Sequence, residues 1–162
     1  MHACQSDHSF GDRPIEMAEN ASELQFGGED LDNEETGTTC LSNAEVAILL
    51  DKQRASLEEQ SEEATPVFKQ TLEYALRFSG TSDPVSNAPA IEALRDALMN
   101  FECERDGGKM EKLHSFEIAA LSNLAPEDYD EVEALIPSIY ARFREDEIEQ
   151  LLELLSQNLE AS

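Results

Sequence analysis

The chain has 162 residues, of which 36 are acidic and 11 are basic, so its formal net charge is -25 at neutral pH. Proteins bind nucleic acids and anionic membranes largely through Lys and Arg, so this balance argues against tight direct binding to such polyanions. A basic protein surface is the natural complement of so acidic a chain. The length suits one domain with a tail, and no apolar run approaches the roughly 20 residues of a membrane span.

The cysteines and the first residues bear on the compartment. Cys4, Cys40 and Cys103 are odd in number, far apart in the sequence and never arranged as a CxxC pair. This pattern argues against a disulfide scaffold or a zinc site, and it indicates a reducing compartment. The first residues carry no apolar core of the kind found in secretory signals, so we expect none.

Residues 1–39 form the first segment, with ten acidic residues and one basic residue. The segment lacks helical periodicity, and we expect it to be an acidic tail that is disordered or ordered only by a partner. Leu24, Phe26 and Leu31 stand out in this polar background. They are either isolated apolar residues of a tail, or a short extended stretch that adds to a sheet or groove of a partner.

Two helices are predicted next. Ser42 and Glu45 have the spacing of a capping box, and Val46, Leu49, Leu50 and Leu57 follow at helical intervals. The acidic run 58–63 is expected to be a frayed end or a loop.

For the second helix, Thr65 is the predicted N-cap, and Pro66 occupies the first helical position. Phe68, Leu72, Ala75 and Leu76 form one apolar stripe, and Thr71, Tyr74 and Phe78 form another. Because a helix that is apolar on two faces is usually covered on both, this pattern predicts a central helix.

Residues 80–89 have the composition of a loop, and a third helix is predicted over about residues 90–101. Its expected inward residues are Ile91, Leu94, Leu98 and Met99. Residues 102–111 combine a Gly pair with many charges, which indicates an exposed loop.

The longest patterned stretch runs from residue 113 to residue 139. Leu113, Phe116, Ala120 and Leu124 share one helical face, which Ile118 and Leu121 widen. Pro126 is expected to begin another helix, with Val132, Leu135 and Ile136 as its apolar stripe, and Pro137 is expected to end it. A final helix carries leucines at three- and four-residue spacing from Ile148 to Leu159. The sequence thus predicts an all-α domain of six helical segments over residues 40–160.

No catalytic, cofactor or metal site is predicted. Nucleophilic catalysis requires a histidine base beside Ser or Cys, and His114 at a helix start is far more typical of a structural residue. His2, Cys4 and His8 make a weak metal site in a polar segment with no fourth ligand nearby. Residues 32–43 resemble a calcium loop in part, but Asn43 stands where such loops need a bidentate Glu.

Six pieces of the sequence, in the same order, resemble the small stalk component of RNA polymerase II, which is the fourth subunit of that enzyme and has an archaeal counterpart. They are NASELQFGGEDL (20–31), LSNAEVAILL (41–50), FKQTLEYALRFS (68–79), LHSFEIAALSNLAPE (113–127), EALIPSI (133–139) and REDEIEQLLELL (144–155). Together the pieces span about 130 residues.

The resemblance implies an HRDC-like helical bundle with an extended acidic N-terminal segment. It also implies a nuclear, non-catalytic subunit that pairs with the larger stalk subunit, which carries an OB-fold, and docks with it beside the clamp of the core polymerase. Nascent RNA would be contacted mainly by that partner. On this basis we expect Leu24, Phe26 and Leu31 to contact the partner or the polymerase core, and Phe116 and Leu121 to lie at the heterodimer interface.

Three alternatives remain at this stage: an HRDC-type nucleic-acid-binding module, the equivalent stalk subunit of another nuclear polymerase, and an acidic helical adaptor unrelated to polymerase. The chain also departs from the family pattern. Residues 102–111 resemble an insertion where relatives often join two helices more briefly, and residues 1–19 match nothing in the family.

Overall fold

The computed structural model describes residues 39–105 and 107–160. The helices and strands of these residues, in chain order, are α1 (Asn43–Glu59), α2 (Pro66–Arg77), α3 (Ala88–Met99), β1 (Glu102–Arg105), β2 (Lys109–Lys112), α4 (Ser115–Leu124), α5 (Tyr129–Leu135), α6 (Pro137–Arg142) and α7 (Glu145–Glu160). The predicted all-α class is confirmed, with one small antiparallel hairpin added to the helices. Leu24, Phe26 and Leu31 lie outside the described residues.

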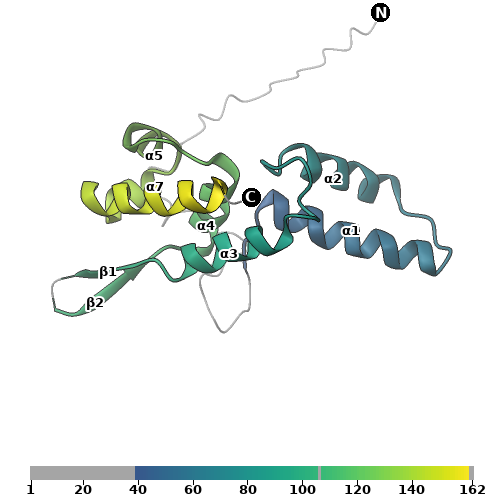
Figure 1. Cartoon of the computed structure of the whole chain (residues 1–162), viewed down its shortest axis with the longest axis horizontal. Coiled ribbons are helices and arrows are strands. Elements are labelled where there is room, and N and C mark those ends of the chain that lie inside the picture. The colour runs from purple at the N-terminus through teal and green to yellow at the C-terminus, as the bar shows by residue number, and fades with distance from the viewer. Residues whose placement is uncertain (1–38, 106, 161–162) are drawn as a thin grey trace, which may run out of the picture.

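The helices form two groups that α3 joins. α1 and α2 lie side by side as a pair that extends away from the rest, while α4, α5 and α7 lie together in the other half of the molecule (Figure 1). α3 packs against α7, α4 and α1. The helical pair is therefore attached to the larger group mainly through α1 and α3.

The main core lies in the larger group. Its fully buried members include Leu98 of α3, Leu121 of α4 and Leu151 of α7, each 0% exposed. A second, smaller cluster consists of Ala44, Ile48 and Ile91, which link α1 to α3. α2 contributes no residue to either cluster.

The predicted starts of α1 and α2 are confirmed. The amide of Ser42 donates to Oε2 of Glu45 at 2.8 Å, and the amide of Glu45 donates to Oγ of Ser42 at 3.3 Å, which completes the capping box. Thr65 caps α2 by accepting a hydrogen bond from the amide of Phe68, with Pro66 in the first turn. Local side-chain chemistry therefore sets both helix starts.

The prediction that the second helix is central is wrong for the chain alone. Ala75 is the one buried residue of α2, and Phe68 and Leu72 are half-buried. Among the described elements, α1 is the only one that α2 contacts extensively. One neighbouring helix can cover one face, so the second apolar stripe of α2 lies open to solvent.

Three further details differ from the prediction. Met99 of α3 points outward, with 52% of its surface exposed. Pro126 begins no helix: α4 ends at Leu124, the next residue Ala125 has a left-handed φ of 44°, and Asp128 instead caps α5. Pro137 ends α5 as expected, but it also opens α6, a six-residue helix that the sequence pattern did not separate.

Residues 102–111 do not form a loop. They belong to a β-hairpin in which Glu102 pairs with Lys112, and Arg105 pairs with Lys109. The turn includes Gly107 and Gly108, whose φ values of 90° and 77° are positive, and only glycine adopts such values at little cost. The Gly pair was the visible signal for this turn.

Two arginines fasten the hairpin to the helices. Arg105 of β1 donates to both carboxylate oxygens of Glu147 in α7, at 2.5 and 2.9 Å. Arg142 of α6 reaches Glu111 of β2 and also Glu117 of α4. The hairpin is thus held at both strands by charge-assisted hydrogen bonds.

Candidate partner-binding surface

The most exposed apolar face of the described residues belongs to α2. Val67, Thr71, Tyr74 and Phe78 repeat at intervals of four, three and four residues, so they fall within about 60° of one another around the helix axis. Val67 is 71% exposed, Tyr74 is 58% exposed and Phe78 is 47% exposed. We call these four residues the α2 stripe.

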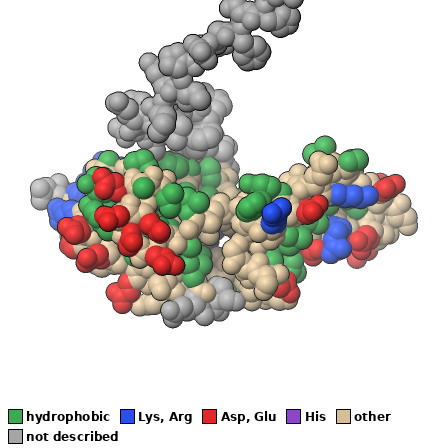
Figure 2. Space-filling model, turned by 90° about the horizontal axis from the view of Figure 1, so that it is seen from above, with side chains coloured by type: hydrophobic (Ala, Val, Ile, Leu, Met, Phe, Trp, Pro, Cys, Tyr) green, Lys and Arg blue, Asp and Glu red, His purple; other side chains and the backbone are tan. Residues whose placement is uncertain are grey.

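The aromatic members of the α2 stripe pack against each other. The ring centroids of Tyr74 and Phe78 are 4.7 Å apart, and the guanidinium of Arg77 lies 5.5 Å from the centroid of Phe78. Aromatic and Arg side chains of this kind are enriched in protein–protein interfaces. Figure 2 shows hydrophobic side chains reaching the surface at the end of the molecule formed by α1 and α2.

A second apolar stripe lies on α4 and consists of Phe116, Ala120 and Leu124. Phe116 and Ala120 are half-buried and Leu124 is 49% exposed. The ring of Phe116 stacks on His114, with the centroids 5.9 Å apart. The opposite face of the helix, which includes Ile118 and Leu121, packs into the core. The sequence pattern treated Ile118 and Leu121 as a widening of the face that carries Phe116, but the structure buries Ile118 and Leu121 and leaves Phe116 and Leu124 partly open.

The residues predicted to contact a partner are therefore separated by the structure. Phe116 lies on the α4 stripe, where part of its surface is open. Leu121 is 0% exposed and packs in the main core, so its side chain offers no surface to a partner in this structure. We assign Leu121 to the core and keep Phe116 as a candidate contact.

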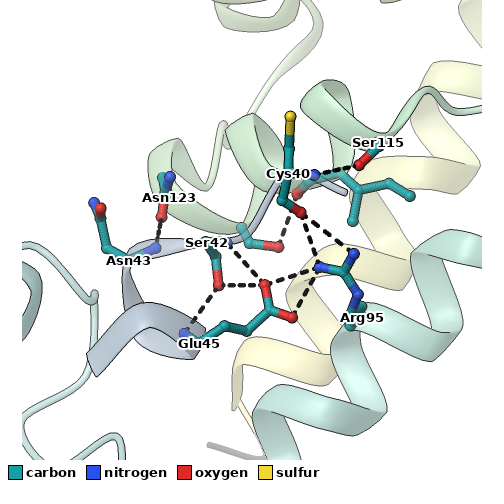
Figure 3. A network of polar contacts seen from close by, with 9 residues as sticks. Cys40, Ser42, Asn43, Glu45, Arg95, Ser115 and Asn123 are labelled. Atoms are coloured by element: carbon teal, nitrogen blue, oxygen red, sulfur yellow. Dashed lines mark hydrogen bonds and ion pairs between the residues drawn. The ribbon is translucent and has the colours of Figure 1, made fainter. Parts of the chain in front are cut away.

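The chain enters the folded domain next to the α4 stripe, and a polar network holds it there (Figure 3). The amide of Cys40 donates to Oγ of Ser115 at 2.7 Å, and the carbonyl of Cys40 accepts from both terminal nitrogens of Arg95 at 3.3 Å. The amide of Asn43 donates to Oδ1 of Asn123 at 2.8 Å. Side chains from α3 and α4 thus bind backbone groups at the start of the domain.

Arg95 links this network to the capping box. Its Nη1 donates to both carboxylate oxygens of Glu45, at 2.8 and 2.9 Å. The side chains of Arg95 and Glu45 are only 17% and 16% exposed. The sequence pattern revealed the cap but not the role of Arg95; the signal was a basic residue directly after Leu94 on a helix whose other inward positions are apolar.

A cavity of about 420 Å³ lies beside the network, between the start of α1, residues 79–82, α3 and the ends of α4 and α7. Ile91, Leu94 and Leu159 form its apolar wall. Glu45 and Arg95 are the only charged residues that line it, and they are paired with each other. The cavity can accept an apolar group, but its one carboxylate is committed to an ion pair.

Neither a cluster of metal ligands nor a membrane-spanning helix is found among the described residues. No group of three or more His, Cys, Asp or Glu residues that could hold a metal ion occurs among them. His2, Cys4 and His8 lie outside this part of the chain, as does most of the loop at 32–43. Within residues 39–105 and 107–160, no helix combines the length and apolar character needed to cross a bilayer.

The shifted pKa of Glu147 is structural in origin. Hydrogen bonds from Arg105 hold the pKa of Glu147 below its ordinary value, with a further contribution from the amide of Arg144. Burial opposes this shift but does not reverse it. Because both donors also fasten the hairpin and the start of α7, the lowered pKa reports an architectural ion pair.

Comparisons with known proteins identify the family. A sequence profile of the family described as RNA polymerase Rpb4 matches residues 40–159. DNA-directed RNA polymerase II subunit 4 of Arabidopsis thaliana is 32% identical over 148 residues, covering 87% of this chain and 94% of the relative. DNA-directed RNA polymerase II subunit rpb4 of Dictyostelium discoideum is 32% identical over 133 residues, covering 72% and 76%. Subunit RPB4 of Saccharomyces cerevisiae is 34% identical over 92 residues, covering 57% and 35%. The chain therefore belongs to the RNA polymerase Rpb4 family.

Proposed function

We propose that this chain is a non-catalytic subunit of DNA-directed RNA polymerase II, and that it forms a heterodimer with the larger stalk subunit. The observation that carries the proposal is the family match, which extends over residues 40–159. It includes every described helix, apart from Glu160 at the end of α7. The relatives from Arabidopsis thaliana and Dictyostelium discoideum bear the names of polymerase II subunits. The proposed role is to support initiation and the handling of the emerging transcript.

The exposed apolar stripes support a role as one half of a heterodimer. The α2 stripe and the α4 stripe both leave large apolar side chains in contact with water, and burying them against a companion is favourable by roughly 25 cal/mol per Å². Leu24, Phe26 and Leu31 of the N-terminal segment are proposed to extend the same interface. Phe116 is the proposed contact at the place where that segment joins the domain.

The charge of the chain supports a division of labour with the partner. A net charge of -25 repels RNA phosphates, so contact with nascent RNA is assigned mainly to the OB-fold of the larger stalk subunit. The polar chemistry of the described residues supports a role without catalysis, since buried carboxylates such as Glu117 and Glu147 are engaged by arginines. We propose that the pair acts in the nucleus, docked beside the polymerase clamp.

Affinity capture tests the assignment to polymerase II. The full-length chain, tagged at its C-terminus, is expressed in the source organism, and the proteins retained at moderate salt are identified by mass spectrometry. We expect the larger stalk subunit and the two largest subunits of polymerase II in comparable amounts. Recovery of the large subunits of a different nuclear polymerase, or of no polymerase subunit, would contradict the proposal.

A further inference from the structure

We infer that Arg95 is a positioning residue for partner binding: with Glu45 and Ser115, it fixes the backbone at Cys40, the point from which the N-terminal segment is presented to a partner. The inference rests on the proposed function, because it concerns how that segment is presented to the larger stalk subunit. It goes beyond that function by naming residues that act without touching the partner.

The first support is that Arg95 does more than helix capping requires. A capping box is complete with Ser42 and Glu45 alone, and both of its reciprocal hydrogen bonds are present. Arg95 adds two hydrogen bonds to the carbonyl of Cys40, a residue that belongs to no helix or strand. These bonds restrain the chain before the helix begins.

The second support is that several independent side chains restrain this short stretch. The amides of Cys40, Ser42 and Asn43 donate to Ser115, Glu45 and Asn123, at 2.7, 2.8 and 2.8 Å. The carbonyl of Cys40 is bound by Arg95 (Figure 3). The acceptors and donors come from α1, α3 and α4, so the stretch moves only if bonds to several helices break.

The third support is the place where this restraint fixes the chain. Ser115, which binds the amide of Cys40, directly precedes Phe116 in α4. Cys40 is therefore fixed at the start of the helix that carries the α4 stripe. The eight residues from 24 to 31 that carry Leu24, Phe26 and Leu31 are separated from Cys40 by another eight, which span at most about 28 Å when fully extended.

Restraint of this kind strengthens binding by reducing the conformational freedom that is lost on association. Fixing the backbone of a residue costs conformational free energy, and a stretch already fixed in the free chain loses less when the partner binds. Arg95 is well suited to the task, because its rigid guanidinium can bind a carboxylate and a carbonyl together, whereas a lysine ammonium is a single flexible point charge.

A double-mutant cycle in the full-length chain tests the inference. One change is Arg95→Met, and the other is the tail variant, in which Leu24, Phe26 and Leu31 are all replaced by Ser. Binding to the purified larger stalk subunit is measured by titration calorimetry for the unsubstituted chain, for each variant and for their combination. Arg54→Met is the matched control, since the ion pairs of Arg54 within the described residues are with Asp51 and Glu58 on α1 itself.

We expect Arg95→Met to weaken binding about tenfold, equivalent to releasing roughly one backbone residue, and Arg54→Met to leave it unchanged. In the tail variant, Arg95→Met should have little further effect, because the segment it positions no longer makes contacts. Equal losses with and without the tail contacts would overturn the inference, since they would mean that Arg95 acts only through the fold. No loss from Arg95→Met would overturn it as well.

A second, milder variant keeps the test valid if Arg95→Met loses its fold. Ser115→Ala removes the acceptor for the amide of Cys40 but leaves the Arg95–Glu45 pair in place, and circular dichroism reports whether either variant loses helix. Ser115→Ala should also weaken binding in a manner that depends on the tail contacts, and additive behaviour in this variant would contradict the positioning role. Failure of the unsubstituted chain to bind the larger stalk subunit would instead overturn the proposed function, and with it this inference.

Discussion

Arg142 of α6 pairs with Glu117 of α4, a carboxylate with no exposure to solvent. Glu117 also accepts hydrogen bonds from Oγ of Ser138 at 2.6 Å and from the amide of His114 at 2.7 Å. These bonds join α6 to the first turn of α4, and the bonded residues of the two helices are 21 and 25 positions apart in the sequence. Removing the cation would leave a buried charge with neutral donors only.

Arg142→Met is therefore expected to destabilise the chain strongly. Loss of one partner from a buried ion pair typically lowers the unfolding free energy by about 3–5 kcal/mol. The substitution also removes the ion pair between Arg142 and Glu111 of the hairpin. Urea denaturation of the full-length chain, followed by circular dichroism, measures the change in unfolding free energy. Arg54→Met is the control and should cost at most about 1 kcal/mol, as is typical of exposed pairs. Similar losses for the two variants would contradict the assigned role of Glu117.

Glu147 predicts how stability depends on pH. Hydrogen bonds from Arg105 lower the pKa of Glu147 in the folded chain below its ordinary value of 4.5. The stabilisation is thus fully present above pH 4.5 and is lost as the pH falls through the lowered value of the folded state. Unfolding free energies measured from pH 7 down to pH 3 should show this loss. In Glu147→Gln the loss between those limits should be smaller, and an unchanged acid dependence would contradict the interpretation.

The two faces of α4 should respond differently to truncation. Leu121→Ala removes a side chain that is 0% exposed, so it should lower the unfolding free energy by about 2–5 kcal/mol. Phe116→Ala alters a half-buried side chain, so it should lower the unfolding free energy less than Leu121→Ala does. It should weaken binding to the larger stalk subunit more. Parallel denaturation and binding measurements check this. A greater loss of affinity from Leu121→Ala, at a temperature where it remains folded, would contradict the assignment of Leu121 to the core.

The α2 stripe should tolerate a charge when the chain is free but not in the complex. Tyr74→Asp places a carboxylate at a position that is 58% exposed, so far-ultraviolet circular dichroism should change little. Affinity for the larger stalk subunit should fall by at least about tenfold, as for an interface hot spot. Gln150→Asp adds the same charge at an exposed position of α7 and should leave affinity unchanged. Equal affinities for the two variants would contradict the prediction that α2 contacts the larger stalk subunit.

The parts of the fold that were predicted correctly depend on short-range chemistry. Ser42 with Glu45, and Thr65 with Pro66, lie within four residues of each other and mark helix starts in any context. Pro137 likewise ends a helix through its effect on the preceding residue. Such signals can be recognised from a single sequence because the interacting groups are close together along the chain.

The errors arose where distant residues or a missing neighbour decide the outcome. Apolar periodicity on α2 correctly predicts an apolar face. It does not say whether this chain or another one covers that face. The pairing of Arg95 with Glu45 joins residues 50 positions apart, and no local pattern predicts it. Strands of four residues, such as β1 and β2, are too short for alternation to distinguish them from a charged loop.

The molar mass of the complex formed on co-expression with the larger stalk subunit tests the central claim most directly. After co-purification through a tag on the partner alone, size-exclusion chromatography with light scattering gives the stoichiometry without assumptions about shape. A single species, with a mass equal to one copy of each chain, is the predicted result. Recovery of the tagged partner without this chain would contradict the claim that the exposed apolar stripes of this chain are covered by that companion.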